Sequence, residues 1–148
     1  DVGDTRYSGS ELVVRKLTEL GADVSVHDPY VDHWYEFENQ DNYPAPGHSW
    51  GRFFHNQDEL TSLRVKKDLK SSLKGMEVMI LAVPHSEYMN LDPVEIVGWA
   101  GNPLAVLDCF GILSDEDIEK YFHLGCEVKA LGRGHIQRIK TKVRNEMK

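Results

Sequence analysis

The chain has few cysteines, no long apolar run and no excess of positive charge, and each shortage excludes a class of protein. Its two cysteines, Cys109 and Cys126, form no C-x-x-C pair, which argues against a disulfide scaffold, a zinc ribbon or a redox motif. No apolar run approaches the roughly 20 residues that span a bilayer, and no charged start leads into an apolar core as in a signal peptide. We therefore expect two buried, inert thiols in a cytoplasmic protein that makes no membrane contact.

Positive charge is also scarce. The formal net charge of −7 at pH 7 argues against broad contact with nucleic acid or an anionic membrane, since both carry negative charge. Of the 148 residues, 41% are apolar and 28% are charged, as in globular proteins. This length is enough for one core, so we predict a single domain over 1–148. Small molecules or other proteins are the expected partners.

A dinucleotide-binding turn is missing as well. An acid placed like Asp28, at the end of a strand, would hold a ribose hydroxyl if a G-x-G-x-x-G turn lay about 20 residues earlier. The stretch before the first predicted helix contains only Gly3 and Gly9. We therefore expect no NAD to bind to this chain alone. Asp28 before Pro29 is equally compatible with a capped turn.

What the chain does contain is a regular alternation of helix and strand signals. A four-residue motif, glycine followed by any residue, an acid and valine, occurs at 21–24, 75–78 and 125–128. Each occurrence joins a helix-like stretch to a β-rich stretch, as expected where glycine ends a helix before a buried strand. Capping signals begin three of the helices, at Ser8 with Glu11, Asp92-Pro93 with Glu95, and Ser114 with Asp117. We predict helices over 9–20, 66–74, 92–98, 115–124 and from Ile136 onward, strands over 23–28, 63–65, 77–83, 103–108 and 126–131, and an irregular segment over 29–61.

This alternation predicts the fold class. Strands that alternate with helices pair in parallel through right-handed crossovers and form an open sheet covered on both faces. We therefore predict a three-layer, Rossmann-like α/β domain with a mainly parallel sheet. In such sheets ligands bind outside the carboxyl ends of the strands.

Three side chains near these ends are candidates for ligand binding. Arg6 lies where the first helix opens and could present forked donors to a phosphate or carboxylate, although an ion pair with Asp4 would explain it equally well. His85 follows the strand 77–83 and could donate to a phosphate or act as a base, or it could be a surface or turn residue. Asp108 closes the strand 103–108 and could instead accept backbone amides of the next loop.

The segment 30–57 differs from the rest in composition. Three histidines in it, His33, His48 and His55, match no compact metal-ligand spacing, so we expect no metal. Long aromatic-rich loops are usually lids, interfaces or small satellite cores, and we favour an interface or a satellite core here. The segment holds eight of the chain's fourteen aromatic residues, Tyr30, Trp34, Tyr35, Phe37, Tyr43, Trp50, Phe53 and Phe54.

Several short motifs together resemble the C-terminal domain of the UDP-glucose/GDP-mannose dehydrogenases. They occur in the family's order and cover most of the chain outside 30–57. The matching stretches are Asp4-Thr5-Arg6-Tyr7-Ser8, the helix through Leu20, Gly21-Ala22-Asp23-Val24, Asp28-Pro29, Leu69 to Gly75, Val78 to His85, and Ala105-Val106-Leu107-Asp108.

The resemblance implies a role in nucleotide-sugar oxidation. Enzymes of this family oxidise the C6 alcohol of a nucleotide sugar to a carboxylate, using NAD and a thioester on a catalytic cysteine. That cysteine belongs to a G-F-G-G-S-C motif, and NAD binds to an N-terminal Rossmann domain; this chain has neither. The resemblance thus implies a UDP-sugar-binding domain with Arg6, His85 and Asp108 near the ligand, no catalytic residue, and no activity alone. The implied partners are the UDP-sugar, the N-terminal domain with a central helix, and further copies in a homo-oligomer.

Two departures from the family pattern, and one likeness to a branch of it, bear on the ligand. Gly9 stands where the family usually has proline, and Phe110 where some members have a nucleotide-contacting arginine. Gly111 resembles the branch of the UDP-N-acetylmannosamine dehydrogenases, so the sugar stays open. The other function left open is a stand-alone Rossmann-like module for nucleotide sensing or protein interaction, with 30–57 as its contact surface.

The resemblance also places a strand, with a nucleotide-contacting lysine, just before Asp1. We therefore expect Asp1 to mark the boundary of an enzyme fragment. In the sheet, that strand would lie between 23–28 and 77–83, and a vacant slot would leave two rows of amides and carbonyls unpaired. We expect these two strands either to pair directly or to be joined by a strand of a neighbouring chain.

Overall fold

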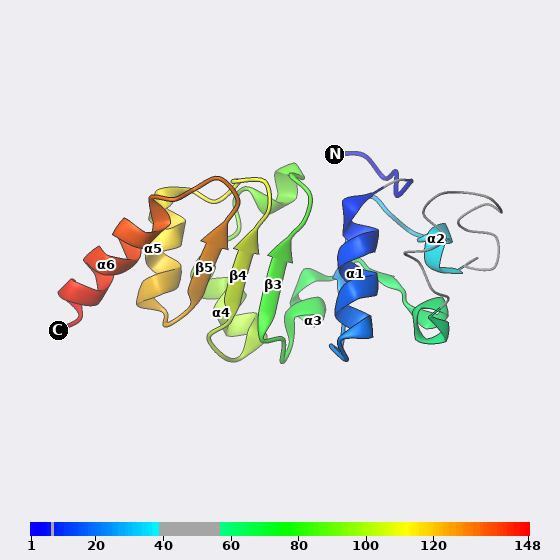
Figure 1. Cartoon of the computed structure of the whole chain (residues 1–148), viewed down its shortest axis with the longest axis horizontal. Helices are drawn as coiled ribbons and strands as arrows, with labels where there is room; N and C mark the ends of the chain where they lie inside the picture. Colours follow the sequence, from blue (N-terminus) through cyan, green and yellow to red (C-terminus); the bar gives the residue numbers. More distant parts are fainter. Residues whose placement is uncertain (7, 39–56) are drawn as a thin grey trace. The chain divides into compact units, whose positions relative to one another are not determined.

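The structure, a computed structural model, describes residues 1–6, 8–38 and 57–148 (Figure 1). The chain forms two compact units. One spans Val2–Leu69, and the other consists of Lys70–Lys148 together with Asp1. A single domain over 1–148 stays a prediction.

The unit Val2–Leu69 contains one long helix and a short parallel ladder. Its elements are α1 (Gly9–Glu19), β1 (Val26–His27), α2 (Tyr35–Glu38), η3 (Asp58–Ser62) and β2 (Val65–Lys66). In the ladder, Val26 lies opposite Val65. Helix α1 begins as predicted, because the Ser8 hydroxyl accepts from the Ser10 amide. The capping box is incomplete, since the carboxylate of Glu11 binds Arg15 instead.

Two residues of the aromatic segment lie in the core of this unit. Trp34 and Phe37 are buried against Val14 and Leu60, and their ring centroids are 4.5 Å apart. For these two residues a satellite core is confirmed. Positions 43, 50, 53 and 54 lie outside the described residues, as do 48 and 55. The prediction that all of 29–61 is irregular is wrong, because α2 and η3 form where buried side chains stabilise a single turn.

The unit Lys70–Lys148 contains a parallel sheet in the order β3-β4-β5. Figure 1 shows these strands side by side, with α5 and α6 next to β5. In the register, Leu81 pairs with Asp108, and Asp108 pairs with Ala130. The elements are α3 (Leu69–Leu73), which begins at the boundary of the unit, β3 (Val78–Leu81), η4 (Ser86–Tyr88), α4 (Pro93–Ala100), β4 (Ala105–Asp108), α5 (Asp115–His123), β5 (Glu127–Ala130) and α6 (Ile136–Glu146).

Helices α4, α5 and α6 begin within one residue of the predicted positions, whereas α3 begins at Leu69 rather than at residue 66, and α4 ends at Ala100 rather than at residue 98. The Asp92 side chain accepts from the Val94 amide, with Pro93 in the first turn. Ser114 accepts from the Asp117 amide in the same way at the start of α5. Gly101 ends α4 at a φ of 82°, a left-handed conformation that glycine adopts without strain.

One face of the sheet supplies the core of this unit. Val106 and Val128 are buried on the central and last strands, and Ile96 and Ile118 of α4 and α5 are completely buried. The alternation of strand side chains turns Val78 outward, where it is 53% exposed. The α/β class with open, parallel sheets is thereby confirmed.

The two strands next to the expected gap belong to different units. Among the described residues, β1 belongs to a sheet with β2, while β3 belongs to the sheet with β4 and β5. Direct pairing of 23–28 with 77–83 stays a prediction. The ladder of β1 is shorter than predicted because Val65 and Lys66 are its only partners there. A strand from a neighbouring chain stays a prediction.

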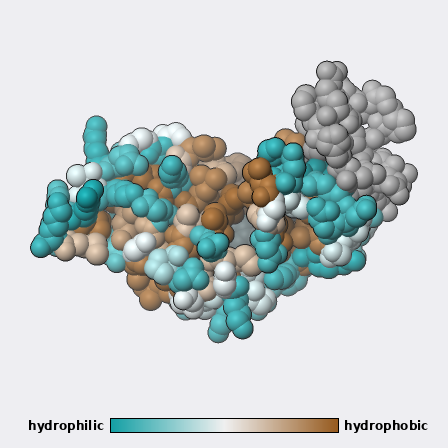
Figure 2. Space-filling model, turned by 60° about the horizontal axis from the view of Figure 1, so that its bottom comes forward, coloured by the Kyte–Doolittle hydropathy of each residue, from teal (hydrophilic) through white to brown (hydrophobic). Residues whose placement is uncertain are grey.

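Hydrophilic side chains cover much of the face shown in Figure 2, with hydrophobic residues between them. Such a mixture is ordinary, since apolar atoms contribute more than half of most protein surfaces. No helix in the described part of the chain is long and apolar enough to span a membrane.

Candidate functional site

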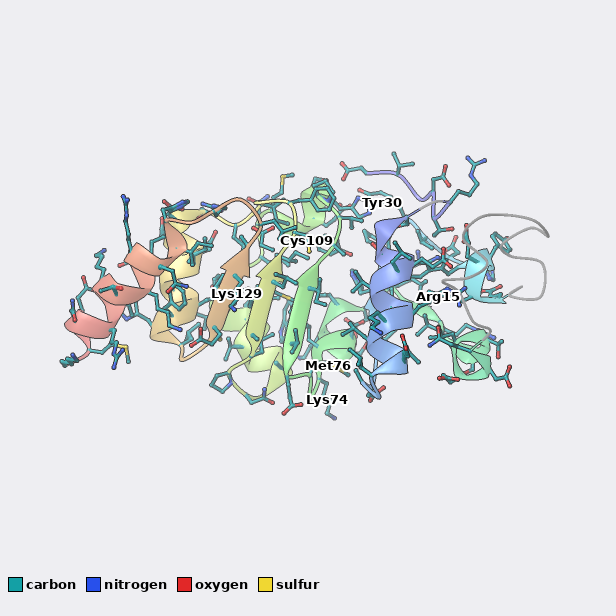
Figure 3. All side chains as sticks on the ribbon, viewed as in Figure 1. Arg15, Tyr30, Lys74, Met76, Cys109 and Lys129 are labelled. Carbon is teal, nitrogen blue, oxygen red and sulfur yellow. The ribbon has the colours of Figure 1, made fainter. Side chains whose placement is uncertain are left out.

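The carboxyl edge of the β3-β4-β5 sheet holds two of the three predicted site residues. His85 follows β3, and Asp108 is the last residue of β4. Cys109, labelled in Figure 3, comes next, and its amide donates to the carbonyl of Leu81. The parallel ladders therefore bring the loops after β3, β4 and β5 to one edge of the sheet.

Asp108 is completely buried and binds the backbone of its own loop. One carboxylate oxygen accepts from the amides of Phe110 at 3.1 Å and Gly111 at 2.8 Å, and the other accepts from the Leu113 amide at 3.0 Å. Gly111 has a φ of +68°, which a larger residue would adopt only with strain. Of the two interpretations from the sequence, the structure shows the one in which Asp108 shapes the loop.

A second set of contacts, not predicted from the sequence, holds the end of that loop. Arg133, between β5 and α6, donates from one guanidinium nitrogen to the carbonyl of Leu113 and from another to the carboxylate of Asp115 at 2.5 Å. His135 lies 2.9 Å from the same carboxylate. The hydrogen bond to His135 lowers the pKa of Asp115 most, and Arg133 lowers it further. A glycine on each side of Arg133, directly after the last strand, is the signal that could have indicated this position.

His85 is buried rather than exposed on the surface. It precedes η4, is 5% exposed, and its ring lies 5.8 Å from that of Tyr88. Its Nδ1 is 3.7 Å from the carboxylate of Asp1. Ser86 donates to the same carboxylate from its amide and its hydroxyl, both at 2.8 Å. The imidazole is thus held in a turn beside an acid and a hydroxyl.

Arg6 belongs to the other unit and makes the ion pair that the sequence allowed. Its Nε and Nη2 donate to the two carboxylate oxygens of Asp4, at 2.9 Å and 2.7 Å. These contacts lower the pKa of Asp4 to about 2. The Arg6 side chain is nevertheless 77% exposed, so the pair fixes its orientation without removing it from solvent.

Asp28, the possible ribose ligand, caps a turn. One of its carboxylate oxygens accepts from the amides of Tyr30 at 2.8 Å and Val31 at 3.0 Å. The alternative of a capped turn before Pro29 is therefore the one that the structure shows.

The two thiols fit an inert role. Cys109 is partly exposed and Cys126 is buried. Burial raises the pKa of both, and Asp108 adds to the effect at Cys109. Each thiol is thereby held in its neutral, less nucleophilic form.

Metal ligands are scarce in the described part of the chain. Glu119, His123 and Glu146 have ligand atoms within 4.8 Å of one another. Lys142 binds within this group, with its ammonium 2.8 Å from Glu119 and 3.9 Å from Glu146. The Lys142 ammonium thus neutralises the negative charge that would otherwise attract a metal cation.

Comparison with known proteins gives a match that covers most of these features. Residues 1–115 match the model of the UDP-glucose/GDP-mannose dehydrogenase family, UDP binding domain. The chain belongs to this family. The predicted resemblance is thereby confirmed, and the match includes Arg6, His85 and Asp108 but ends before Arg133. No curated protein matches significantly.

A solved structure agrees with the fold of this family member. The crystal structure of NDP-N-acetyl-D-galactosaminuronic acid dehydrogenase from Methanosarcina mazei Go1 matches with a TM-score of 0.68 and 20% sequence identity. The match covers 93% of this chain and 23% of that chain. The family member described here therefore spans about a quarter of the length of that dehydrogenase.

Proposed function

We propose that the chain is the UDP-sugar-binding domain of an NAD-dependent nucleotide-sugar 6-dehydrogenase, an oxidoreductase that converts the C6 alcohol to a carboxylate. The observation that carries this proposal is the match of residues 1–115 to the UDP binding domain of the family. The family match also disfavours the alternative of a stand-alone sensing or interaction module. The precise nucleotide sugar stays open.

In this proposal the chain binds and orients the nucleotide and leaves the oxidation to other parts of the enzyme. Hydride transfer to NAD would take place elsewhere in the enzyme, because the sequence contains no G-x-G-x-x-G turn. The carboxylate of Asp28, which could have held a ribose, accepts from two amides of its own turn. We therefore expect the isolated chain to bind a UDP-sugar and to be inactive. The N-terminal domain, the central helix and further copies of the enzyme are the proposed partners.

Three residues carry the proposed binding. The exposed guanidinium of Arg6 would donate to phosphate, because its planar fork suits phosphate oxygens. His85 would contribute a hydrogen bond at the carboxyl edge of the sheet. Asp108 would act indirectly, by holding the loop that displays Phe110, whose side chain is 57% exposed.

Isothermal titration calorimetry tests this proposal on the 148-residue chain. UDP and UDP-sugars should bind, while NAD and ADP should give no heat. Arg6→Ala should weaken UDP binding by about 10-fold or more, the value of a charge-assisted hydrogen bond. Lys16→Ala is a matched control, because Lys16 is an exposed cation on α1, the helix that follows Arg6, and its ammonium pairs with Glu19. Absence of heat with every uridine nucleotide would contradict the proposal.

A further inference from the structure

A buried, charged network lies in the unit Val2–Leu69, next to the loop that carries Arg6. Glu11, Arg15 and Glu36 are 2%, 6% and 7% exposed. The Nε of Arg15 donates to a carboxylate oxygen of Glu11 at 2.8 Å, and its Nη2 donates to the backbone carbonyl of Glu36 at 3.2 Å. Figure 3 labels Arg15 on α1, and its guanidinium lies 5.0 Å from the centre of the Phe37 ring. The network thus joins α1 to α2.

The side chain of Glu36 extends this network to the N-terminal loop. One of its carboxylate oxygens accepts from the hydroxyl of Thr5 at 2.8 Å. The carbonyl of Thr5 in turn accepts from the amide of Ser8, the capping residue of α1. Thr5 is therefore held by its side chain and its backbone, immediately before Arg6.

A purely structural contact between α1 and α2 would not need these charges. Burying carboxylates and a guanidinium carries a large desolvation cost, and apolar residues of similar volume often stabilise a protein as well or better. Desolvation raises the pKa of Glu11 even with Arg15 beside it. What hydrogen-bonded charges add is one defined geometry, because each partner must lie at a set distance and angle. In this unit the geometry so defined reaches Thr5.

We propose that Glu36 is a positioning residue for Arg6, and that the turn α2 serves to present it. The inference rests on the proposed function, in which Arg6 contacts the nucleotide sugar. Asp4 orients the guanidinium of Arg6, while Glu36 fixes the backbone through Thr5. Burial of Phe37 holds α2 in place. Helix α2, which lies in the described part of 30–57, thereby supports the loop that carries Arg6.

Two neighbouring glutamates of α2 allow a matched test by UDP titration of the 148-residue chain. Glu36→Ala should weaken binding by about 5- to 10-fold, the equivalent of one ordinary hydrogen bond. Glu38→Ala is the control, since Glu38 lies two residues further along and faces His33 at 3.3 Å. It should leave binding unchanged. Glu36→Gln retains an acceptor for Thr5 and should restore most of the affinity.

A double-mutant cycle separates positioning from general destabilisation. In an Arg6→Ala background, Glu36→Ala should cause no further loss of affinity, because the residue that it positions is gone. A full additional loss in that background would overturn the inference. If Glu36→Ala does not fold, Thr5→Val replaces the hydroxyl with a methyl group of similar size, and Thr5→Ser keeps the hydroxyl. Thr5→Val should then weaken binding while Thr5→Ser does not, and equal affinities would overturn the inference.

The experiments distinguish a failure of the proposed ligand contact of Arg6 from a failure of the positioning role of Glu36. If Arg6→Ala binds UDP as well as the unchanged chain, the proposed ligand contact is wrong, and the positioning role falls with it. If Arg6→Ala weakens binding while a folded Glu36→Ala variant does not, only the positioning role is wrong. Circular dichroism and a thermal melt of each variant show that the compared proteins are folded.

Discussion

Removal of the Asp108 carboxylate should destabilise the unit Lys70–Lys148 more than any exposed substitution in it. Asp108→Ala leaves three amides without their acceptor, those of Phe110, Gly111 and Leu113. The bond to Leu113 is buried, so its loss carries the full cost of an unsatisfied donor, about 2–3 kcal/mol. The other two amides are partly buried and can turn to water, which limits their loss to about 1 kcal/mol each. The free energy of unfolding should therefore fall by about 4 kcal/mol.

Urea unfolding followed by circular dichroism measures this change at neutral pH. Asp108→Asn should lie between Asp108→Ala and the unchanged chain, because the amide oxygen still accepts while the NH2 group faces a donor. Glu116→Ala is the control: its carboxylate is exposed and pairs with Lys120, so its effect should stay within about 0.5 kcal/mol. A loss below about 1 kcal/mol in Asp108→Ala, with an unchanged dependence on urea, would refute the reasoning.

Three further predictions concern single side chains. Tyr121 is completely buried, burial raises its pKa, and its hydroxyl has no hydrogen-bond partner among the described residues. Tyr121→Phe should therefore leave the midpoint of urea unfolding unchanged or raise it. A clear fall in the midpoint would indicate that the hydroxyl has a partner. The pKa of Asp4 should be about 2 by NMR titration and return toward 3.8 in Arg6→Ala. Because this folded-state pKa is lowered, the ion pair should favour the folded state above about pH 4 and be lost as the pH falls toward 2, with no change near neutral pH. Both thiols should react slowly with iodoacetamide at pH 7, and Cys126 more slowly than Cys109, since burial raises the pKa of each; rapid labelling of Cys126 would contradict its burial.

The elements that the sequence predicts well are those whose start and stop depend on neighbouring residues. Asp92 and Pro93 begin α4 as predicted, with contacts made inside the same few residues, although the helix runs to Ala100 rather than to residue 98. Such local contacts leave a pattern that can be recognised before any tertiary structure is known. The same holds for α5, where Ser114 caps the first turn.

The elements that the sequence predicts poorly depend on distant partners. The turn α2 has no capping signal, and its residues are held by burial of Phe37 and by Arg15, which is far from them in sequence. The short ladder of β1 depends equally on Val65 and Lys66 of β2. Arg133 was missed for the same reason, since its partners Leu113 and Asp115 lie on another loop.

The candidate site shows a related difficulty with aspartates at the ends of strands. Asp28 and Asp108 were both candidates for ligand contact, and both accept amides of the turn that follows them. A chain that leaves a strand exposes several amides in succession, and a short carboxylate at the last strand position can reach them without strain. An aspartate at this position is therefore weak evidence for a ligand contact. If Asp108 only shapes the loop, Asp108→Asn should weaken ligand binding only as far as it disturbs that loop. Across variants of Asp108, the affinity for the ligand and the protection of the amides of Phe110 to Leu113 from hydrogen exchange should therefore fall together.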